Sequence, residues 1–508
     1  MDNEDSVTQF CKKIKRGFYR FMEYFSTRNS AHRVSPAEAI RRGLAPDGGL
    51  YMPAEFPPFP MAELPRMSVA EIAVSVLSRL FDDFSEEELS RAVHAAYDGA
   101  FPGGDIAPLH TLSRVRVMEL FHGPTCAFKD VALSLLPHLL SAAARKCGVN
   151  EEICILTATS GDTGSAALSG FSDVAGTRVF VFYPENGVSP AQRKQMVTCP
   201  GKNTAVCAVK GNFDDAQSGV KAIFASCPPP RGMRWSSANS INIGRLAPQV
   251  TYYFKAYRDL LADGSIVPGE RVNFVVPTGN FGDILAGYFA GQMGLPVGRL
   301  ICASNANRVL YDFFRTGCYD RRREFHLTQS PSMDILVSSN LERLLYLFCG
   351  AEETAAMMKE LKEKGVYTVS RAAHTAMQRE FFAGWADDAR TADVIREVYR
   401  TEGYLMDPHT AVGYAAYLDF LTSGVADRAV TVLLATASPF KFSSAVLQAL
   451  GEDGGTGDET DMERLSRLSG APIPSPLAAL RDLPVRHTAY CRPDEMADFI
   501  RNVTEGQS

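Results

Sequence analysis

The sequence lacks the features that mark several large classes of protein. No apolar run among its 508 residues is as long as a membrane span requires. The formal net charge of -6 leaves no broad basic field of the kind that attracts nucleic acid. No internal repeat is present. We therefore expect partners that are small molecules, with no membrane and no nucleic acid.

The eleven cysteines form neither a disulfide framework nor a metal-binding pattern. Their number is odd, none are arranged as Cys-x-x-Cys, and zinc-site spacings are absent. We interpret them as reduced thiols of a cytoplasmic protein and expect no metal site. The chain also contains neither G-x-G-x-x-G nor a Walker A loop, which argues against nicotinamide dinucleotides and nucleoside triphosphates.

The central part of the chain predicts an α/β protein with more than one domain. A length of 508 residues exceeds what one hydrophobic core usually serves. Short runs that are largely apolar rather than alternating, as in strands buried on both faces, each lead into a turn and then a helix-like stretch. These runs are 153–156, 179–182, 273–276, 300–303 and 429–434. Strand, turn and helix in repetition indicate mainly parallel sheets.

Other segments predict helices and loops. Residues 68–81 and 85–97 are amphipathic, and Ser85 with Glu88 fits a capping box. Residues 341–403 also predict helices, rich in Leu, Ala, Met and Glu. The acidic, glycine-rich run 451–460 predicts an exposed loop.

The N-terminal end carries basic and aromatic residues in alternation. Such a segment can bind membranes or act as a transit peptide. However, Asp2, Glu4 and Asp5 precede it, and transit peptides avoid acidic residues. We therefore interpret it as a loosely attached extension.

Lys129 is the strongest single candidate for a catalytic residue. It stands just before an apolar run, 131–144, that predicts a helix. An ammonium group there lies near the positive end of the helix dipole, which favours the neutral amine. The neutral amine is the form that attacks an aldehyde. A lone lysine is more often a surface group, so its interpretation depends on the residues further along the chain.

Two glycine-rich turns supply the missing context. They are Ser160-Gly161-Asp162-Thr163-Gly164 and Gly279-Asn280-Phe281-Gly282-Asp283, each between a predicted strand and a predicted helix. Backbone N–H groups at such places bind anions, although either turn alone is also a common tight connection. With Lys129, they suit a cofactor that has both an aldehyde and a phosphate, namely pyridoxal phosphate. The second turn would hold its phosphate, the first a substrate carboxylate, and Thr436 would face the pyridine nitrogen.

Longer motifs occur in the order of one enzyme family. They are Ser26-Thr27-Arg28, residues 43–50, residues 122–130, Phe213-Asp214-Asp215, residues 239–245, 279–283, 330–334, 407–411 and 436–442. Through these motifs the chain, from about residue 24 to residue 445, resembles the threonine synthase family of fold-type II pyridoxal phosphate enzymes. The resemblance implies an architecture like the β subunit of tryptophan synthase, with two α/β domains and a helical N-terminal unit.

The resemblance also implies domain boundaries. Residues 1–23 would be an N-terminal extension and 24–110 the N-terminal unit. The large cofactor-binding domain would comprise 111–130 and 240–508, and the small α/β domain 131–239.

Residue roles are implied in the same way. Lys129 forms the imine with the cofactor and moves protons, while Gly279, Asn280, Phe281 and Gly282 cradle the cofactor phosphate. Thr436 faces the ring nitrogen. Ser160, Asp162 and Thr163 lie over the substrate carboxylate and the phenolic oxygen of the cofactor, although Asp162 departs from members that have asparagine there. Arg245, Lys441, Lys194 and Arg193, with Asn239, Ser240 and Asn242, are the candidates for the substrate phosphate. For His122 and His409 we expect structural roles instead of proton transfer.

The implied reaction converts O-phosphohomoserine and water to threonine and phosphate. The same lysine and turns would also serve a related phospholyase, or a serine/threonine dehydratase that releases α-ketobutyrate. A non-catalytic descendant that acts as a binding or scaffold protein is a third alternative, against which the intact Lys129 and both turns argue. A monomer or homodimer is expected.

Overall fold

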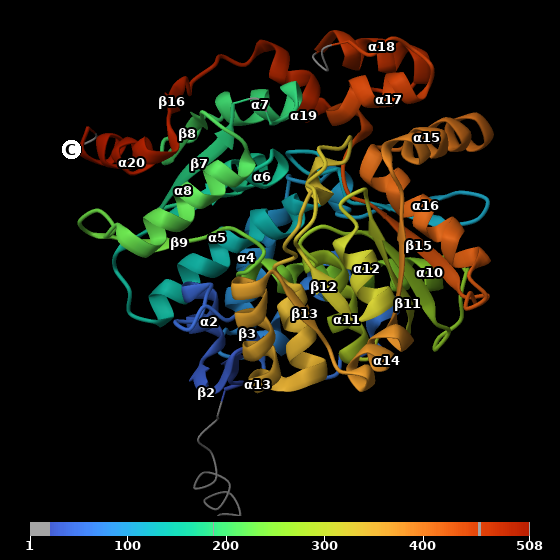
Figure 1. The fold of residues 1–508 in the computed structure, drawn as a ribbon, viewed down its shortest axis with the longest axis horizontal. Helices are drawn as coiled ribbons and strands as arrows, with labels where there is room; N and C mark the ends of the chain where they lie inside the picture. The colour runs from blue at the N-terminus through green and yellow to red at the C-terminus, as the bar shows by residue number, and fades with distance from the viewer. Residues whose placement is uncertain (1–20, 186, 456–458, 507–508) are drawn as a thin grey trace, which may run out of the picture.

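Two mainly parallel sheets and an N-terminal unit make up most of the described part of the molecule. The computed structural model describes residues 21–508 except 186, 456–458 and 507–508 (Figure 1). The basic residues predicted to form part of an extension, between 12 and 20, lie outside the described residues. No helix in the described ranges is long and apolar enough to cross a membrane. The same ranges contain no group of three or more His, Cys, Asp or Glu side chains that could hold a metal ion.

The larger sheet has six strands in the order β14-β11-β10-β15-β5-β4. Its strands are β4 (Leu109–Thr111), β5 (Arg116–Glu119), β10 (Val272–Pro277), β11 (Val297–Ser304), β14 (Phe381–Trp385) and β15 (Val430–Ala435). All neighbours run parallel except β4 and β5. The helices that connect or cover them are α10 (Val250–Ala262), α11 (Gly282–Gln292), α12 (Val309–Thr316), α13 (Leu341–Lys364), α14 (Arg371–Glu380), α15 (Asp388–Glu402), α16 (Pro408–Thr422) and α17 (Ser443–Ala449).

The smaller sheet has five parallel strands in the order β16-β8-β7-β6-β9. They are β6 (Glu152–Ala158), β7 (Thr177–Pro184), β8 (Thr204–Val209), β9 (Met233–Ser236) and β16 (Ala489–Cys491). Its helices are α5 (Lys129–Lys146), α6 (Asp162–Phe171), α7 (Pro190–Val197), α8 (Phe213–Ser226) and α20 (Met496–Glu505). All five predicted strands are therefore confirmed, three of them in the larger sheet and two in this one.

Strand residues alternate between two cores, which explains why the predicted strands are largely apolar. In β6, Ile153 and Ile155 belong to the main core with residues of α5 and α6. Their neighbours Cys154 and Leu156 belong to a second core that includes residues of α8 and α20. Because both faces are covered, no position in the strand can be polar at low cost.

The N-terminal unit combines helices with a small antiparallel sheet. The helices α3 (Val69–Leu80) and α4 (Glu86–Tyr97) are as predicted, and the Ser85–Glu88 capping box is present. They accompany α2 (Pro36–Arg42) and a sheet of β1 (Tyr24–Ser26), β2 (Asn29–Val34) and β3 (Tyr51–Pro53). The predicted helical N-terminal unit therefore also contains a small antiparallel sheet.

Of the strands for which no prediction was made, two change the predicted organisation of the chain. β14 lies within the predicted helical segment 341–403 and is parallel to β11 at the edge of the larger sheet. β16 pairs with β8, so the C-terminal end lies on the smaller sheet, with α20 beside it (Figure 1). The assignment of all residues from 240 to 508 to the large domain is wrong at this end. In the predicted loop 451–460, the described residues 451–455 are not helical, whereas α18 (Glu459–Ser469) begins within it.

Candidate functional site

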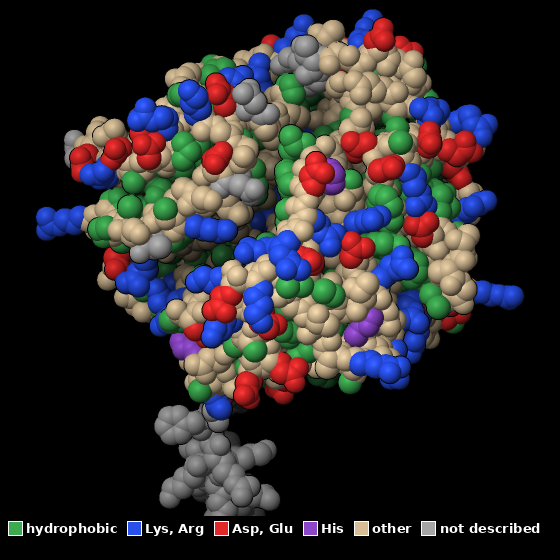
Figure 2. All heavy atoms as spheres, in the orientation of Figure 1, with side chains coloured by type: hydrophobic (Ala, Val, Ile, Leu, Met, Phe, Trp, Pro, Cys, Tyr) green, Lys and Arg blue, Asp and Glu red, His purple; other side chains and the backbone are tan. Residues whose placement is uncertain are grey.

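A cavity of about 730 Å³ lies where strands of both sheets end. Ala158 ends β6, Pro277 ends β10 and Thr436 follows β15, and all three line the cavity. The carboxyl ends of parallel strands are the usual place for ligands in open α/β sheets. Figure 2 shows acidic and basic side chains interspersed over one face of the molecule, which is hollowed between the lobe of α8 and α20 and the lobe of α13.

The backbone fixes Lys129 beside the turn that follows β15. The amide of Phe128 donates to the carbonyl of Thr436 at 2.9 Å, and the amide of Ser438 donates to the carbonyl of Cys126 at 3.1 Å. Lys129 is the first residue of α5, as the sequence predicts, and its side chain lines the cavity. The structure therefore brings Lys129 and Thr436 to the same wall.

The Lys129 amine is poised to lose its proton near neutral pH. Burial lowers its pKa to about 8, because a charged ammonium is poorly solvated there. The nearby Asp162 carboxylate opposes this shift in pKa, whereas the positive charges of Arg245 and Lys441 reinforce it. A lysine with such a pKa is a candidate for a nucleophile and proton carrier.

The turn at 279–282 forms an anion nest at the start of α11. All four residues line the cavity, and Phe281 is the N-cap of α11 with a left-handed backbone (φ 63°). No acceptor for their four amides is found among the described residues. Gly279 is required by a close approach, since a Cβ there would lie 2.5 Å from the carbonyl oxygen of Ser332. Free amides at a helix N-terminus are suited to a phosphate.

Two residues that sequence reasoning missed hold this nest in place. The Ser338 hydroxyl donates to the carbonyl of Gly279 at 2.9 Å. The side-chain amide of Asn340 donates to the carbonyl of Asn280 at 2.9 Å and also to the Ser240 hydroxyl at 2.9 Å. Because the carbonyls are tied to the protein, the amides of the turn are left for a ligand. Only the fold reveals these contacts, since about sixty positions separate Asn340 from Asn280.

The turn at 160–164 forms a second, partly satisfied nest. Gly161 has φ 131°, a conformation that residues with a side chain rarely adopt. The Thr159 hydroxyl already accepts from the amides of Gly161 and Gly164, each at 2.9 Å. Ser160 and Thr163 line the cavity, so their position fits the predicted contact with a carboxylate.

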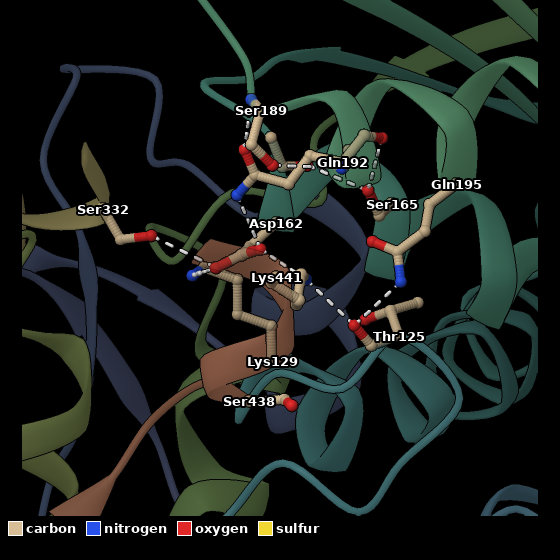
Figure 3. Close-up of polar contacts among 12 residues, drawn as sticks. Thr125, Lys129, Asp162, Ser165, Ser189, Gln192, Gln195, Ser332, Ser438 and Lys441 are labelled. Atoms are coloured by element: carbon tan, nitrogen blue, oxygen red, sulfur yellow. Dashed lines mark hydrogen bonds and ion pairs between the residues drawn. The ribbon is translucent and has the colours of Figure 1, made fainter. Parts of the chain in front are cut away.

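Asp162, the first residue of α6, lies between two lysines (Figure 3). One carboxylate oxygen is 2.6 Å from Lys441 Nζ, and the other is 3.5 Å from Lys129 Nζ. Although burial by itself would raise its pKa, the two ammonium groups hold the pKa of Asp162 well below its usual range. The protein itself therefore neutralises the charge of this ionised carboxylate.

Two predicted substrate ligands do not reach the cavity. Lys441 is fully buried and donates to Asp162 and to the carbonyl of Thr125 at 2.9 Å. Asn242 caps α9 (Ile243–Leu246): its side-chain oxygen accepts from the amide of Gly244, and its side-chain amide donates to the carbonyl of Ile40 at 2.9 Å. Neither lines the cavity. Both predictions were wrong because motif membership reports that a residue is needed, not which way its side chain points.

Arg245, by contrast, is a buried cation on the cavity wall. It lies on α9, is 5% exposed, and donates from one guanidinium nitrogen to the carbonyl of Ala238 at 2.7 Å. Burial lowers its pKa to about 10, so it stays protonated at neutral pH. No carboxylate among the described residues lies within ion-pair distance of it. A buried, uncompensated cation facing a cavity favours an anionic ligand.

The other charged candidates fall into separate places. Arg193 and Lys194 line a different cavity of about 170 Å³ beside α7. His122 pairs with Glu119 at 2.7 Å. His409 lines the main cavity, and its Nδ1 lies 2.7 Å from Asp407 while its Nε2 accepts from the amide of Ser332 at 3.2 Å. Both histidines have protein partners, in line with the predicted structural roles.

For further residues around the cavity no site role was predicted, although Ser332, Phe213 and Leu44 lie within the matched motifs. The Gln192 side chain donates to Asp162 at 2.9 Å, and the Ser332 hydroxyl donates to Asp162 at 3.2 Å. At the mouth, α8 presents residues with helical spacing toward the cavity: Phe213, Gln217, Val220, Lys221 and Phe224. Arg42 and Leu44 also line the cavity. Contacts between segments this distant in sequence are set by the fold alone.

Three known protein families match successive parts of the chain and together cover most of it. "Threonine synthase N terminus" matches residues 23–97, and "Pyridoxal-phosphate dependent enzyme" matches residues 106–437. "Threonine synthase, C-terminal" matches residues 410–500.

Individual proteins agree with these descriptions. The chain is 41% identical to a threonine synthase of Pseudomonas aeruginosa over 84% of this chain and 90% of that protein. A crystal structure of pyridoxal-phosphate-bound threonine synthase from Brucella melitensis has a TM-score of 0.84 at 36% identity, covering 95% of this chain and 99% of that one. A crystal structure of yeast threonine synthase has a TM-score of 0.85 at 32% identity, with the same coverage of 95% and 99%.

Proposed function

The chain belongs to the threonine synthase family of pyridoxal-phosphate-dependent enzymes, and we propose that it converts O-phosphohomoserine and water to L-threonine and phosphate. Its likeness to the solved threonine synthases confirms the predicted fold-type II architecture. The observation that supports this substrate best is the pairing of two anion positions in one cavity, the nest at 279–282 and Arg245, with Lys129 in the same lining.

The residues present fit the cofactor. The amides of 279–282 suit its phosphate, the Lys129 amine with a pKa of about 8 suits its aldehyde, and Thr436 offers a hydroxyl for its ring nitrogen. When bound, pyridoxal phosphate supplies a carbonyl that takes up amines and a ring that withdraws electrons from the adjacent carbon. We assign Asp162 to the neighbourhood of the phenolic oxygen, as the resemblance implies.

The remaining groups account for the substrate. Ser160 and Thr163, beside the helix N-terminus of α6, would bind the substrate carboxylate. Arg245 would bind the phosphate that leaves, because a guanidinium forms strong hydrogen bonds with phosphate oxygens. A fixed cation at the departing phosphate would stabilise the negative charge that the phosphate takes with it.

Lys129 would also carry protons. An amine with a pKa near neutrality can accept a proton from carbon and return it within one turnover. Asp162, which is fully buried and held by several donors, would stay ionised while the charge of Lys129 changes. Water has to be excluded before the phosphate leaves and admitted afterwards, and the apolar mouth residues of α8 are placed to limit its entry.

Three further assignments are proposals that rest on the sequence. The implied division is 24–110, 111–130 with 240–508, and 131–239, amended so that the C-terminal β16 and α20 join the small domain. The cysteine pattern suggests a cytoplasmic enzyme. A monomer or homodimer is expected, which sedimentation would distinguish.

The activity can be tested with a purified, cofactor-loaded enzyme. Incubation with O-phosphohomoserine should release phosphate and threonine in equal amounts. Lys129→Ala should abolish turnover without unfolding the protein, because both the anchor and the proton carrier are lost. Release of phosphate with α-ketobutyrate in place of threonine would assign the chain to the alternative phospholyase reaction. Neither product, from a protein that binds the cofactor, would reject both.

A further inference from the structure

Lys441 is a buried cation for which the proposed reaction has no direct use. Its side chain is fully buried and it is absent from the cavity lining, so it cannot touch the substrate. It lies in the short helical turn Pro439–Phe442, which follows Thr436, and reaches Asp162 at 2.6 Å. Burying an ammonium group is costly, which indicates that its charge serves a purpose.

The contacts of Asp162 show what that purpose is (Figure 3). One oxygen accepts from Lys441 Nζ at 2.6 Å and from the Gln192 amide at 2.9 Å. The other accepts from the Ser332 hydroxyl at 3.2 Å and lies 3.5 Å from Lys129 Nζ. Three donors, one of them charged, therefore hold the carboxylate independently of Lys129. The longest of the four contacts is the one to the reactive amine.

The charges of the three side chains also indicate that Asp162 does not depend on Lys129. Asp162 and Lys441 together carry no net charge. Lys129 can therefore lose its proton without leaving the Asp162 carboxylate unpaired. Without Lys441, loss of the proton from Lys129 would leave a buried carboxylate with no cation in contact. Such a carboxylate would hold the proton on the amine, since opposite charges close together favour the ionised form of both groups.

We propose that Lys441 is a positioning residue: as the permanent counter-ion of Asp162, it allows Lys129 to become the neutral amine that reacts with an aldehyde. The inference rests on the proposed function, in which Lys129 is the amine that receives the cofactor. It assigns Lys441 a role in setting the reactivity of Lys129 instead of the predicted contact with substrate phosphate.

All charged groups near Lys129 are consistent with this role. Asp162 raises the pKa of Lys129, while Arg245 and Lys441 lower it. Asp283 also feels Lys129, but burial dominates and raises the pKa of Asp283 to about 6, and its carboxylate is bound by the hydroxyls of Tyr252 and Tyr253. Asp162 is thus the one carboxylate among the described residues in ion-pair contact with the amine.

The pKa of Lys129 can be measured without substrate. Protein from which the cofactor has been removed is labelled with trace acetic anhydride between pH 6 and 11, and the peptide with Lys129 is quantified by mass spectrometry. The wild type should show a midpoint of about 8. Lys441→Met should raise this midpoint by more than about one pH unit, a tenfold loss of neutral amine at pH 7.

A charge-neutral double variant separates this role from packing. Asp162→Asn/Lys441→Met removes both members of the pair, so the midpoint should return to the wild-type value or fall below it. Lys255→Met is the matched control: Lys255 is equally buried and paired with Asp105 at 2.7 Å, but lies outside the cavity lining, and its loss should leave the midpoint unchanged. Lys441→Gln replaces Lys441→Met if the latter does not fold.

The outcomes are distinct. An unshifted Lys129 midpoint in Lys441→Met or Lys441→Gln overturns the proposal, as does a double variant whose midpoint stays raised. Because the labelling uses neither cofactor nor substrate, it remains readable if the threonine synthase activity is not found.

Discussion

Arg245 offers the sharpest test of the proposed substrate. Substitution by glutamine keeps a polar side chain but removes the charge from the cavity wall. In the structure one guanidinium nitrogen donates to Ala238, and Nε and the second terminal nitrogen have no acceptor among the described residues. Both are therefore available to a phosphate.

The expected loss can be worked out from those two donors. A hydrogen bond to a charged group contributes about 1.5–3 kcal/mol, and the loss of two such bonds, partly replaced by glutamine, costs about 3–4 kcal/mol. Since about 1.4 kcal/mol corresponds to a factor of ten, kcat/KM for O-phosphohomoserine should fall about 100- to 1000-fold. The affinity for the cofactor should change little, because the nest at 279–282 is intact.

The assay is phosphate release under conditions far below KM, alongside a cofactor titration by visible absorbance. Arg258→Gln serves as the control, since Arg258 bonds to Asp259 and to the carbonyl of Met67 and does not line the cavity. A fall in kcat/KM of less than about tenfold, or an equal loss of cofactor affinity, would refute the assignment of Arg245 to the substrate phosphate.

Three other predictions concern the nest, the amine and the C-terminal end. Gly279→Ala should weaken cofactor binding at least about tenfold, because its Cβ would lie 2.5 Å from the Ser332 carbonyl oxygen. Gly291→Ala, in the helix α11 that follows this turn, meets only Val297 at 3.5 Å and should bind the cofactor normally in equilibrium dialysis. The rate at which cofactor-free protein takes up pyridoxal phosphate should rise with pH through about 8, because the reactive neutral amine of Lys129 becomes more abundant above its pKa; a flat profile in stopped-flow absorbance would contradict this. Met496→Ala should lower the free energy of unfolding by about 2–4 kcal/mol in urea, since Met496 is 1% exposed and packs in the second core of the small sheet, while Tyr490→Ala at a half-exposed position should cost much less.

The sequence is sufficient for those parts of the fold that depend on local patterning. The five predicted strands are largely apolar and are followed by clear turns, so each was found. β14 was missed because Phe381 follows α14 directly, with no glycine, proline or polar turn to separate strand from helix. β16 was missed because its three residues are placed by pairing with β8, almost three hundred positions earlier.

The candidate site also has features that the sequence predicts and features that only the fold reveals. Lys129 at a helix start and the two nests could be predicted, because dipole and backbone geometry are local properties. The sequence could not predict which cation faces the cavity, because Arg245 and Lys441 both lie within motifs. Only the fold shows that Arg245 lines the cavity, whereas Lys441 is buried against Asp162. The capping role of Asn242 had a possible signal in the sequence, since asparagine is a preferred N-cap residue. In the structure its side-chain oxygen accepts from the amide of Gly244, two residues later, as in a standard N-cap.

The central claim is that Lys129 binds pyridoxal phosphate covalently while the nest at 279–282 holds its phosphate. The most direct measurement is the visible absorption spectrum of the purified protein before and after borohydride, with mapping of the modified peptide. We predict a visible band that borohydride removes, with the reduced cofactor attached to Lys129. Attachment to another lysine, or a protein that stays colourless after incubation with pyridoxal phosphate, would contradict the claim.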